Sequence, residues 1–172
     1  MQFNHYGGNG AELASALANV VDHSPAGLAE ALSAQRIRDP EPNEDQAREL
    51  TAWCERLRPV FGERDQQHQI ALVNALLVDG TTRVRIATHD GHPPHLHYQG
   101  EVDDLVSRVR AVTAGGLAVA VCGAGGHRLG RCERQGCEVT FIDTSRNGRR
   151  RFCSVTCANR VNVARHRSRH RS

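Results

Sequence analysis

Four cysteines near the end of this 172-residue chain limit what its last part can fold into. Cys132 and Cys137 enclose four residues, Cys153 and Cys157 enclose three, and 15 residues separate the two pairs. Each pair can present two thiolates from one tight turn. The spacing therefore predicts a closed, tetrahedral site for one structural zinc ion. Four protein ligands leave no open coordination position, so we expect no reaction at this metal.

Two other uses of four cysteines fit the same spacing. Two disulfides would consume all four, and an iron–sulfur cluster also takes four thiolates. The N-terminus has no basic segment followed by an apolar run, which is the mark of an export signal. We therefore expect a cytoplasmic protein, in which paired cysteines bind metal more often than they form disulfides. Cys54 and Cys122 lie apart in apolar surroundings and are interpreted as small core residues.

The residues around the cysteines predict the shape of the module. Residues 138–143 have the pattern of a short strand, the Asn-Gly pair at 147–148 favours a hairpin turn, and residues 149–152 would form the return strand. Ser154 would then cap a helix that begins at or just before residue 157 and runs toward residue 169. The helix dipole favours thiolate charge at that end. Together these features describe a treble-clef-like zinc finger.

Charge is distributed unevenly along the chain. Residues 1–126 contain 10 arginines and 16 acidic residues, a net charge of −6, whereas residues 127–172 contain 12 arginines and 3 acidic residues, a net charge of +9. The chain contains no lysine, and codon bias in a GC-rich genome would explain this choice of arginine but not its position. Localised basicity indicates a polyanionic partner. We therefore predict an N-terminal domain at 1–126 and a finger at 127–172.

The basic residues of the finger predict binding to double-stranded DNA. Arginine donates paired hydrogen bonds to phosphate and to guanine, and asparagine pairs similarly with adenine. The expected contacts are Arg146, Arg149, Arg150, Arg151, Asn159, Arg160, Arg165, Arg167 and Arg169. The alternatives are a solvated basic surface, or arginines that dock on the acidic N-terminal domain. Because one small finger binds DNA weakly, we also expect a homodimer.

The N-terminal domain is predicted to be mainly helical from its apolar spacing. The expected helices are residues 10–22, a short helix after a Ser24 cap, 43–61, 65–78 and 101–113. Gly115 and Gly116 are expected to end the last of these, and residues 117–121 would be either its continuation or a buried strand. No stretch approaches the roughly 20 apolar residues that span a bilayer, so we expect no membrane association.

Four histidines lie within nine residues of a predicted β-hairpin, whose strands are residues 83–88 and 94–99. They are His89, His92, His95 and His97. Three imidazoles can hold a metal ion or another ligand, and such a cluster also senses pH near neutrality. The plainer interpretation is a polar hairpin tip. No acid–base pair or nucleophile is identifiable beside the histidines, so we expect that the protein is not an enzyme.

Several stretches of the finger match a known pattern. They are Cys132-x4-Cys137, Phe-Ile-Asp-Thr-Ser-Arg-Asn at 141–147, Arg-Arg-Phe-Cys-Ser at 150–154 and Cys-Ala-Asn-Arg at 157–160. With these residues the finger resembles the bacterial CGNR zinc finger family, whose name comes from Cys-Gly-Asn-Arg. Ala158 replaces the glycine, and because alanine is small and a better helix former, the fold should survive.

This resemblance implies that the four cysteines bind the metal and that the protein binds DNA and controls transcription. The upstream part is more loosely similar to the ABATE domain, which is joined to this finger in stress-induced transcription regulators. The combined prediction is an α+β protein: a mainly helical N-terminal domain with a small β-hairpin, which receives a small-molecule or protein signal, and a C-terminal DNA-binding finger with one zinc ion. Two other functions fit, a protein-interaction module and a sensor or metalloenzyme that uses the cluster His89–His97.

Overall fold

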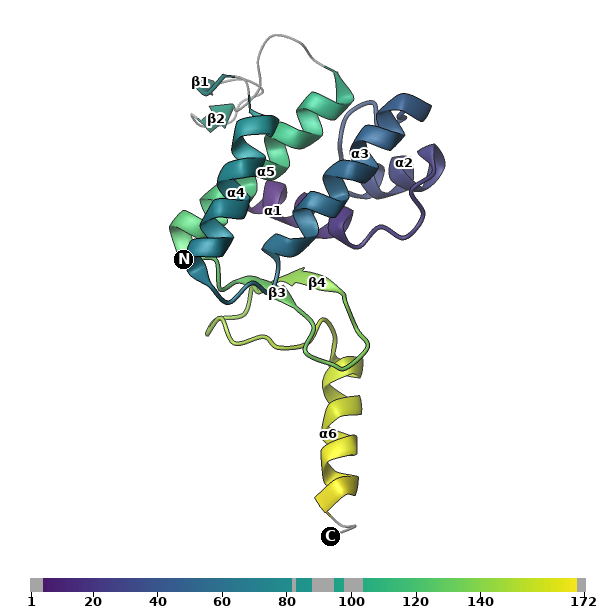
Figure 1. Ribbon diagram of the computed structural model, residues 1–172, viewed down its shortest axis with the longest axis vertical. Helices are drawn as coiled ribbons and strands as arrows, with labels where there is room; N and C mark the ends of the chain where they lie inside the picture. The colour runs from purple at the N-terminus through teal and green to yellow at the C-terminus, as the bar shows by residue number, and fades with distance from the viewer. Residues whose placement is uncertain (1–4, 82, 88–94, 98–103, 170–172) are drawn as a thin grey trace.

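The computed structural model describes residues 5–81, 83–87, 95–97 and 104–169 (Figure 1). Its elements in chain order are α1 (His5–Ala18), α2 (Pro25–Ala34), α3 (Glu44–Leu57), the 3-10 turn η1 (Arg58–Val60), α4 (Gln66–Gly80), β1 (Arg85–Ala87), β2 (His95–His97), α5 (Leu105–Ala124), β3 (Leu129–Arg131), β4 (Thr140–Ile142) and α6 (Val155–Arg169). Helices α1–α5 form one body, β3 and β4 lie across one end of it, and α6 extends away from that end (Figure 1). The expected α+β class is confirmed.

Local capping sets the starts of the helices. The Ser24 hydroxyl accepts a hydrogen bond from the Gly27 N–H at 3.1 Å, as its position before Pro25 predicts. Asn43 begins α3 with a capping box: its side chain accepts from the Gln46 N–H at 2.9 Å, and the Gln46 side chain accepts from the Asn43 N–H at 3.0 Å. The Asp65 carboxylate caps α4 by accepting hydrogen bonds from the Gln67 N–H at 2.9 Å and the His68 N–H at 3.3 Å.

Helix α1 ends earlier than its apolar pattern predicts. The last turn closes at Ala18, where the Val20 N–H donates to the Leu17 carbonyl at 3.1 Å, and Val21 is 92% exposed. The expected helix over 10–22 was therefore wrong at its C-terminal end. The physical reason is that Asn19, the residue after the helix, forms hydrogen bonds with β4 through its side chain.

Helix α5 is the centre of the body, between α1 and α4. The expected stop at Gly115 and Gly116 was wrong, because α5 continues to Ala124, and of the two alternatives for residues 117–121 the continuing helix is confirmed. Gly116 faces the α1 backbone so closely that a Cβ on it would lie 2.4 Å from the carbonyl carbon of Gly10. The glycine thus permits a close contact between two helices, and the packing outweighs its low helix propensity.

Helix α5 also tests the expectation that no stretch of the chain is apolar enough to span a membrane. It is 20 residues long with a mean hydropathy of 1.5 over its most apolar window, so one helix is long and apolar enough to cross a membrane. The expectation that no such stretch exists was therefore wrong. Just over half of that window is buried inside the protein, which is the arrangement of a core helix.

Strands β1 and β2 form the expected antiparallel hairpin, with Ile86 opposite Leu96. The second hairpin differs from the prediction. The strand expected over 138–143 is present as β4, but residues 149–152 are not its partner; β4 instead pairs with β3. The treble-clef description stays a prediction, because the expected hairpin of residues 138–143 and 149–152 is replaced by the pairing of β4 with β3.

Two features explain this choice of partner. Gly130 of β3 leaves room for the opposing Phe141 ring, since a Cβ on this glycine would lie 2.4 Å from the ring. Leu129, only 2% exposed, anchors β3 in the same apolar core as the helices. The expected domain division at residue 126 stays a prediction, but residues from both sides of this position pack into one hydrophobic core.

Candidate metal centre

The first pair of cysteines lies in a tight turn between β3 and β4. The Cys132 N–H donates to the Val139 carbonyl at 2.9 Å, and the Cys137 N–H donates to the Arg134 carbonyl at 2.9 Å. Gly136 adopts a φ of +73°, a left-handed conformation that glycine takes without a steric penalty. The turn therefore directs both sulfur atoms to one side.

The second pair lies at the start of α6. Ser154 caps this helix as expected: its hydroxyl accepts from the Cys157 N–H at 3.2 Å, and its carbonyl accepts from the Ala158 N–H at 3.1 Å. Cys153 precedes the cap and Cys157 lies in the first turn. The positive end of the helix dipole therefore faces the thiolates, as the sequence predicts.

The four sulfur atoms fit a single zinc ion. All of them lie within 4.8 Å of one another, with Sγ–Sγ distances of 3.8 Å for Cys137–Cys153, 3.5 Å for Cys153–Cys157 and 4.0 Å for Cys137–Cys157. A tetrahedron with Zn–S bonds of about 2.3 Å places its sulfurs roughly 3.8 Å apart. All six cysteines are free, and disulfide sulfurs would lie about 2 Å apart. The two-disulfide alternative does not fit this structure, and the prediction of one structural zinc site is confirmed.

Arg134 adds a positive charge to this site. Its Nε–H donates to the Cys157 Sγ at 3.2 Å. The hydrogen bond from Arg134, with that from Ser154, lowers the pKa of the Cys157 thiol to about 6. Burial raises the pKa of the Cys153 thiol to about 12. The sequence pattern did not predict this role of Arg134, although its position between the ligands Cys132 and Cys137 could have indicated it.

The loop between β4 and α6 is built around Asp143, which is 1% exposed. Its carboxylate accepts hydrogen bonds from the Ser145 N–H at 2.8 Å and the Arg150 N–H at 2.7 Å. Burial by itself would raise the pKa of Asp143, but these bonds and the charge of Arg128 lower it below its ordinary value. The carboxylate takes the Arg150 N–H, a backbone donor that the expected return strand over 149–152 would have used.

Two of the expected DNA contacts are engaged inside the finger. The Arg150 side chain donates to the carbonyls of Phe152 at 3.0 Å and Cys153, and its guanidinium lies 4.4 Å from the centre of the Phe141 ring. Arg151 forms an ion pair with Glu133, with an Nε–Oε2 distance of 2.7 Å. Both arginines thus hold the loop in place, a role that the sequence reasoning did not predict.

The other expected contacts lie on two exposed segments. Arg146 and Arg149 belong to the loop after β4, and Asn159, Arg160, Arg165 and Arg167 belong to α6. Their side chains are exposed. Arg169 ends α6, and its side chain lies outside the described part of the chain. The finger therefore presents its remaining arginines at the loop and along one helix.

The histidine cluster is only partly described. His97 lies opposite Arg85 and His95 opposite Ala87, so the two histidines occupy alternate positions of β2. His89 and His92 lie outside the described residues. Among the residues that the structure describes, the four cysteines are the group of three or more metal-binding side chains that lies close enough to hold an ion.

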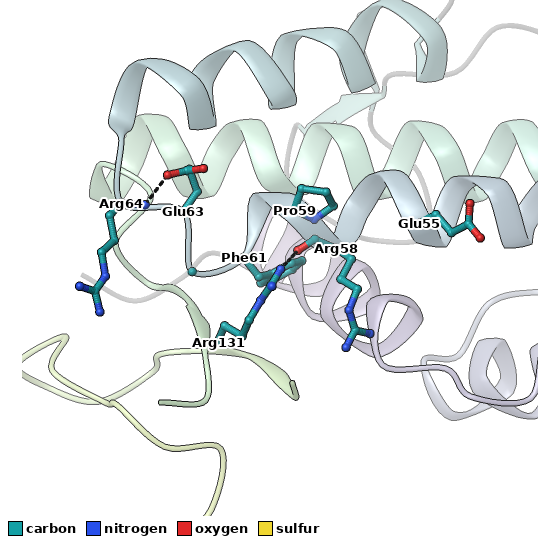
Figure 2. Close-up of a pocket in the computed structure, with 8 residues that line it drawn as sticks. Glu55, Arg58, Pro59, Phe61, Glu63, Arg64 and Arg131 are labelled. Carbon is teal, nitrogen blue, oxygen red and sulfur yellow. Dashed lines mark hydrogen bonds between the residues drawn. The ribbon is translucent and has the colours of Figure 1, made fainter. Parts of the chain in front are cut away.

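A shallow groove of about 590 Å³ lies where η1 meets β3 (Figure 2). Its lining combines charged side chains with Pro59 and Phe61, and the Arg131 guanidinium crosses it to donate to the Arg58 carbonyl at 2.8 Å. Gly62 also lines the groove, and its N–H donates to the Leu129 carbonyl at 2.7 Å. The groove thus lies where one side-chain and one backbone hydrogen bond join the finger to the helical body.

Comparison with known protein families agrees with this geometry. Residues 128–170 match the family model of the CGNR zinc finger. The match covers about a quarter of the chain and includes all four cysteines, so this segment is similar to that family and carries four cysteines placed to bind one metal ion. No curated protein matches the chain.

Proposed function

We propose that the finger binds double-stranded DNA through α6 and that the protein is a transcription regulator. The observation that carries the proposal is the exposure of α6, which extends away from the body (Figure 1) and is exposed throughout residues 162–168. A helix of 15 residues with so little packing is marginally stable by itself. A partner that surrounds it would supply the missing contacts.

The dimensions and charge of α6 suit the major groove of DNA. Its 15 residues span about 22 Å, and the groove is wide enough to admit one helix. Arg160 and Arg167 are seven residues apart, which places them on one side of the helix, while Arg165 lies more than a third of a turn away. Arginines on two sides can contact the phosphates that border the groove on both strands.

Between these arginines runs a polar edge of the helix, formed by Asn159, Asn162 and His166. Asn159 and Asn162 are both exposed. Side-chain amides pair with the N6 and N7 atoms of adenine, so this edge would face the bases while the arginines contact phosphate. Asn162 was absent from the sequence-based set of contacts and joins it because helix geometry places it beside Asn159.

The test is the binding of the zinc-loaded full-length protein to random duplex DNA over a series of salt concentrations. For B-DNA, log K falls by about 0.9 per phosphate contact for each log unit of salt. We expect the Arg160→Gln/Arg167→Gln variant to bind more weakly and with a shallower slope. The matched control is Arg36→Gln/Arg48→Gln, which removes the same charge from the helical body and should leave the slope unchanged.

Three outcomes would count against DNA binding. They are no binding at low salt, a salt slope near zero, or equal losses in the two double variants. In the first case the arginines would serve an acidic protein partner, which is the rival function. The proposals of a homodimer and of an ABATE-type signal-receiving domain are separate, and depend on sedimentation of the intact protein and on identification of its ligand.

A further inference from the structure

We propose that Arg134 is a positioning residue of the zinc centre, which holds the helix-borne ligand Cys157 in place and shields its thiolate from electrophiles. The inference rests on the geometry of the metal site and does not depend on the binding of DNA.

Arg134 connects the two halves of the site. Its carbonyl accepts the Cys137 N–H at 2.9 Å, so its backbone position is set by the turn that carries the first two ligands. Its side chain reaches across to the Cys157 Sγ at 3.2 Å, and it also interacts with the Cys137 thiol. One residue of the turn therefore contacts a ligand from each cysteine pair.

The charge of the site gives this contact its importance. A zinc ion with four thiolates carries a net charge of −2, and a guanidinium beside it offsets part of this charge. A hydrogen bond to a coordinated thiolate also withdraws electron density from the sulfur, which makes it a weaker nucleophile. Residues that support metal ligands in this way commonly contribute about 10- to 100-fold to metal affinity.

The ligands differ in their exposure and in the hydrogen bonds that their sulfur atoms accept. Cys157 is 7% exposed and accepts the Arg134 hydrogen bond. Cys153 is more exposed, and outside the sulfur cluster its Sγ makes a long contact of 4.0 Å with the Ser154 hydroxyl. We therefore expect electrophiles to modify Cys153 before Cys157, and the delay at Cys157 to depend on Arg134.

The experiment uses the zinc-loaded full-length protein in a Cys122→Ser background. Cys54 is buried as expected, but the expectation that Cys122 is a core residue was wrong, because it is an exposed free thiol. The variants are Arg134→Gln, Arg134→Lys and, as a control for lost charge in the same finger, Arg146→Gln. Zinc affinity is measured by competition with a chelator. The order of cysteine modification by N-ethylmaleimide is followed by mass spectrometry.

We expect Arg134→Gln to lower zinc affinity about 10-fold or more and to shorten the delay at Cys157. Arg134→Lys should restore part of both, and Arg146→Gln should change neither. Unchanged affinity and order in Arg134→Gln, or an equal loss in Arg146→Gln, would overturn the proposal. If Arg134→Gln does not retain zinc, the protein with Arg134 intact decides: modification of Cys157 before or together with Cys153 would also overturn it.

Discussion

Asn19 and Thr140 pair as neighbouring residues of a β-sheet do, although 121 positions separate them in the chain. The Asn19 amide donates to the Thr140 carbonyl at 2.9 Å, and the Thr140 N–H donates to the Asn19 Oδ1 at 2.8 Å. The Thr140 hydroxyl also donates to the Ser15 carbonyl at 3.1 Å. The end of α1 thus serves as an edge partner for β4 and joins the finger to the body.

Asn19→Ala should destabilise the whole protein by roughly 1–3 kcal/mol, since it leaves the N–H and carbonyl of the buried Thr140 without these partners. The measurement is chemical denaturation monitored by circular dichroism. Asn74→Ala, at an exposed position of α4, is the matched control and should change stability by less than about 0.5 kcal/mol. Equal midpoints for the two variants would show that the pairing contributes nothing.

Gly116→Ala should destabilise the protein by about 1–3 kcal/mol or more, because its Cβ would meet backbone atoms of Gly10 and Ala11 that cannot move aside. In the same helix, a Cβ on Gly123 would meet nothing within 4 Å. Gly123→Ala should therefore raise stability, by up to about 1 kcal/mol, through helix propensity alone. Thermal unfolding of both variants checks this, and a loss of stability in both would contradict the packing argument.

Removal of zinc, or Cys153→Ser, should unfold α6 and the loops that carry the cysteines while α1–α5 keep their structure, because the metal supplies the folding free energy of the ligand turns. Amide hydrogen exchange should show lost protection over 132–137 and 144–169. Protection at β4 should persist in part, since Thr140 is held by Asn19. Cys122→Ser, which removes an exposed cysteine, is the control, and an unaltered exchange pattern in Cys153→Ser would refute the structural role of the metal.

The contribution of Asp143 should depend on pH. Its pKa in the folded protein lies below its ordinary value, so its stabilising effect is complete above the unfolded-state pKa of about 3.9 and is lost as the pH falls through the lower folded value. The free energy of unfolding should differ between the natural chain and Asp143→Asn at pH 6, and the difference should shrink below about pH 4. Zinc is bound in both proteins, so its own acid release affects both. A difference that grows in acid would contradict this assignment.

Glu133→Gln should strengthen DNA binding if the proposed function holds. Glu133 pairs with Arg151 and lies 3.8 Å from Arg64, so its removal would leave Arg151 available to phosphate. The salt slope of log K should steepen by up to about 0.9, which corresponds to one further contact. Glu30→Gln, on the exposed face of α2, removes the same charge from the body and should leave the slope unchanged. A slope unchanged in both would place Arg151 outside the interface.

Much of the local structure could be predicted from the sequence because it depends on residues close together in the chain. Ser24, Asn43 and Ser154 cap the helices that follow them, as their positions predict. The metal site is of the same kind, since each tight turn carries two of its ligands and the spacing alone indicates the coordination chemistry.

Contacts between distant segments decided the rest. Gly116 signals a helix end when considered locally, yet α5 continues through it because α1 packs against its bare backbone. The sequence also left the partner of β4 undetermined. In the structure the buried Leu129 and the hydrogen bonds to Asn19 favour β3 over residues 149–152. The sequence by itself determined which residues bind zinc and where charge gathers. The tertiary structure decided which arginines remain exposed, because carbonyls and acids elsewhere in the finger engage Arg150 and Arg151.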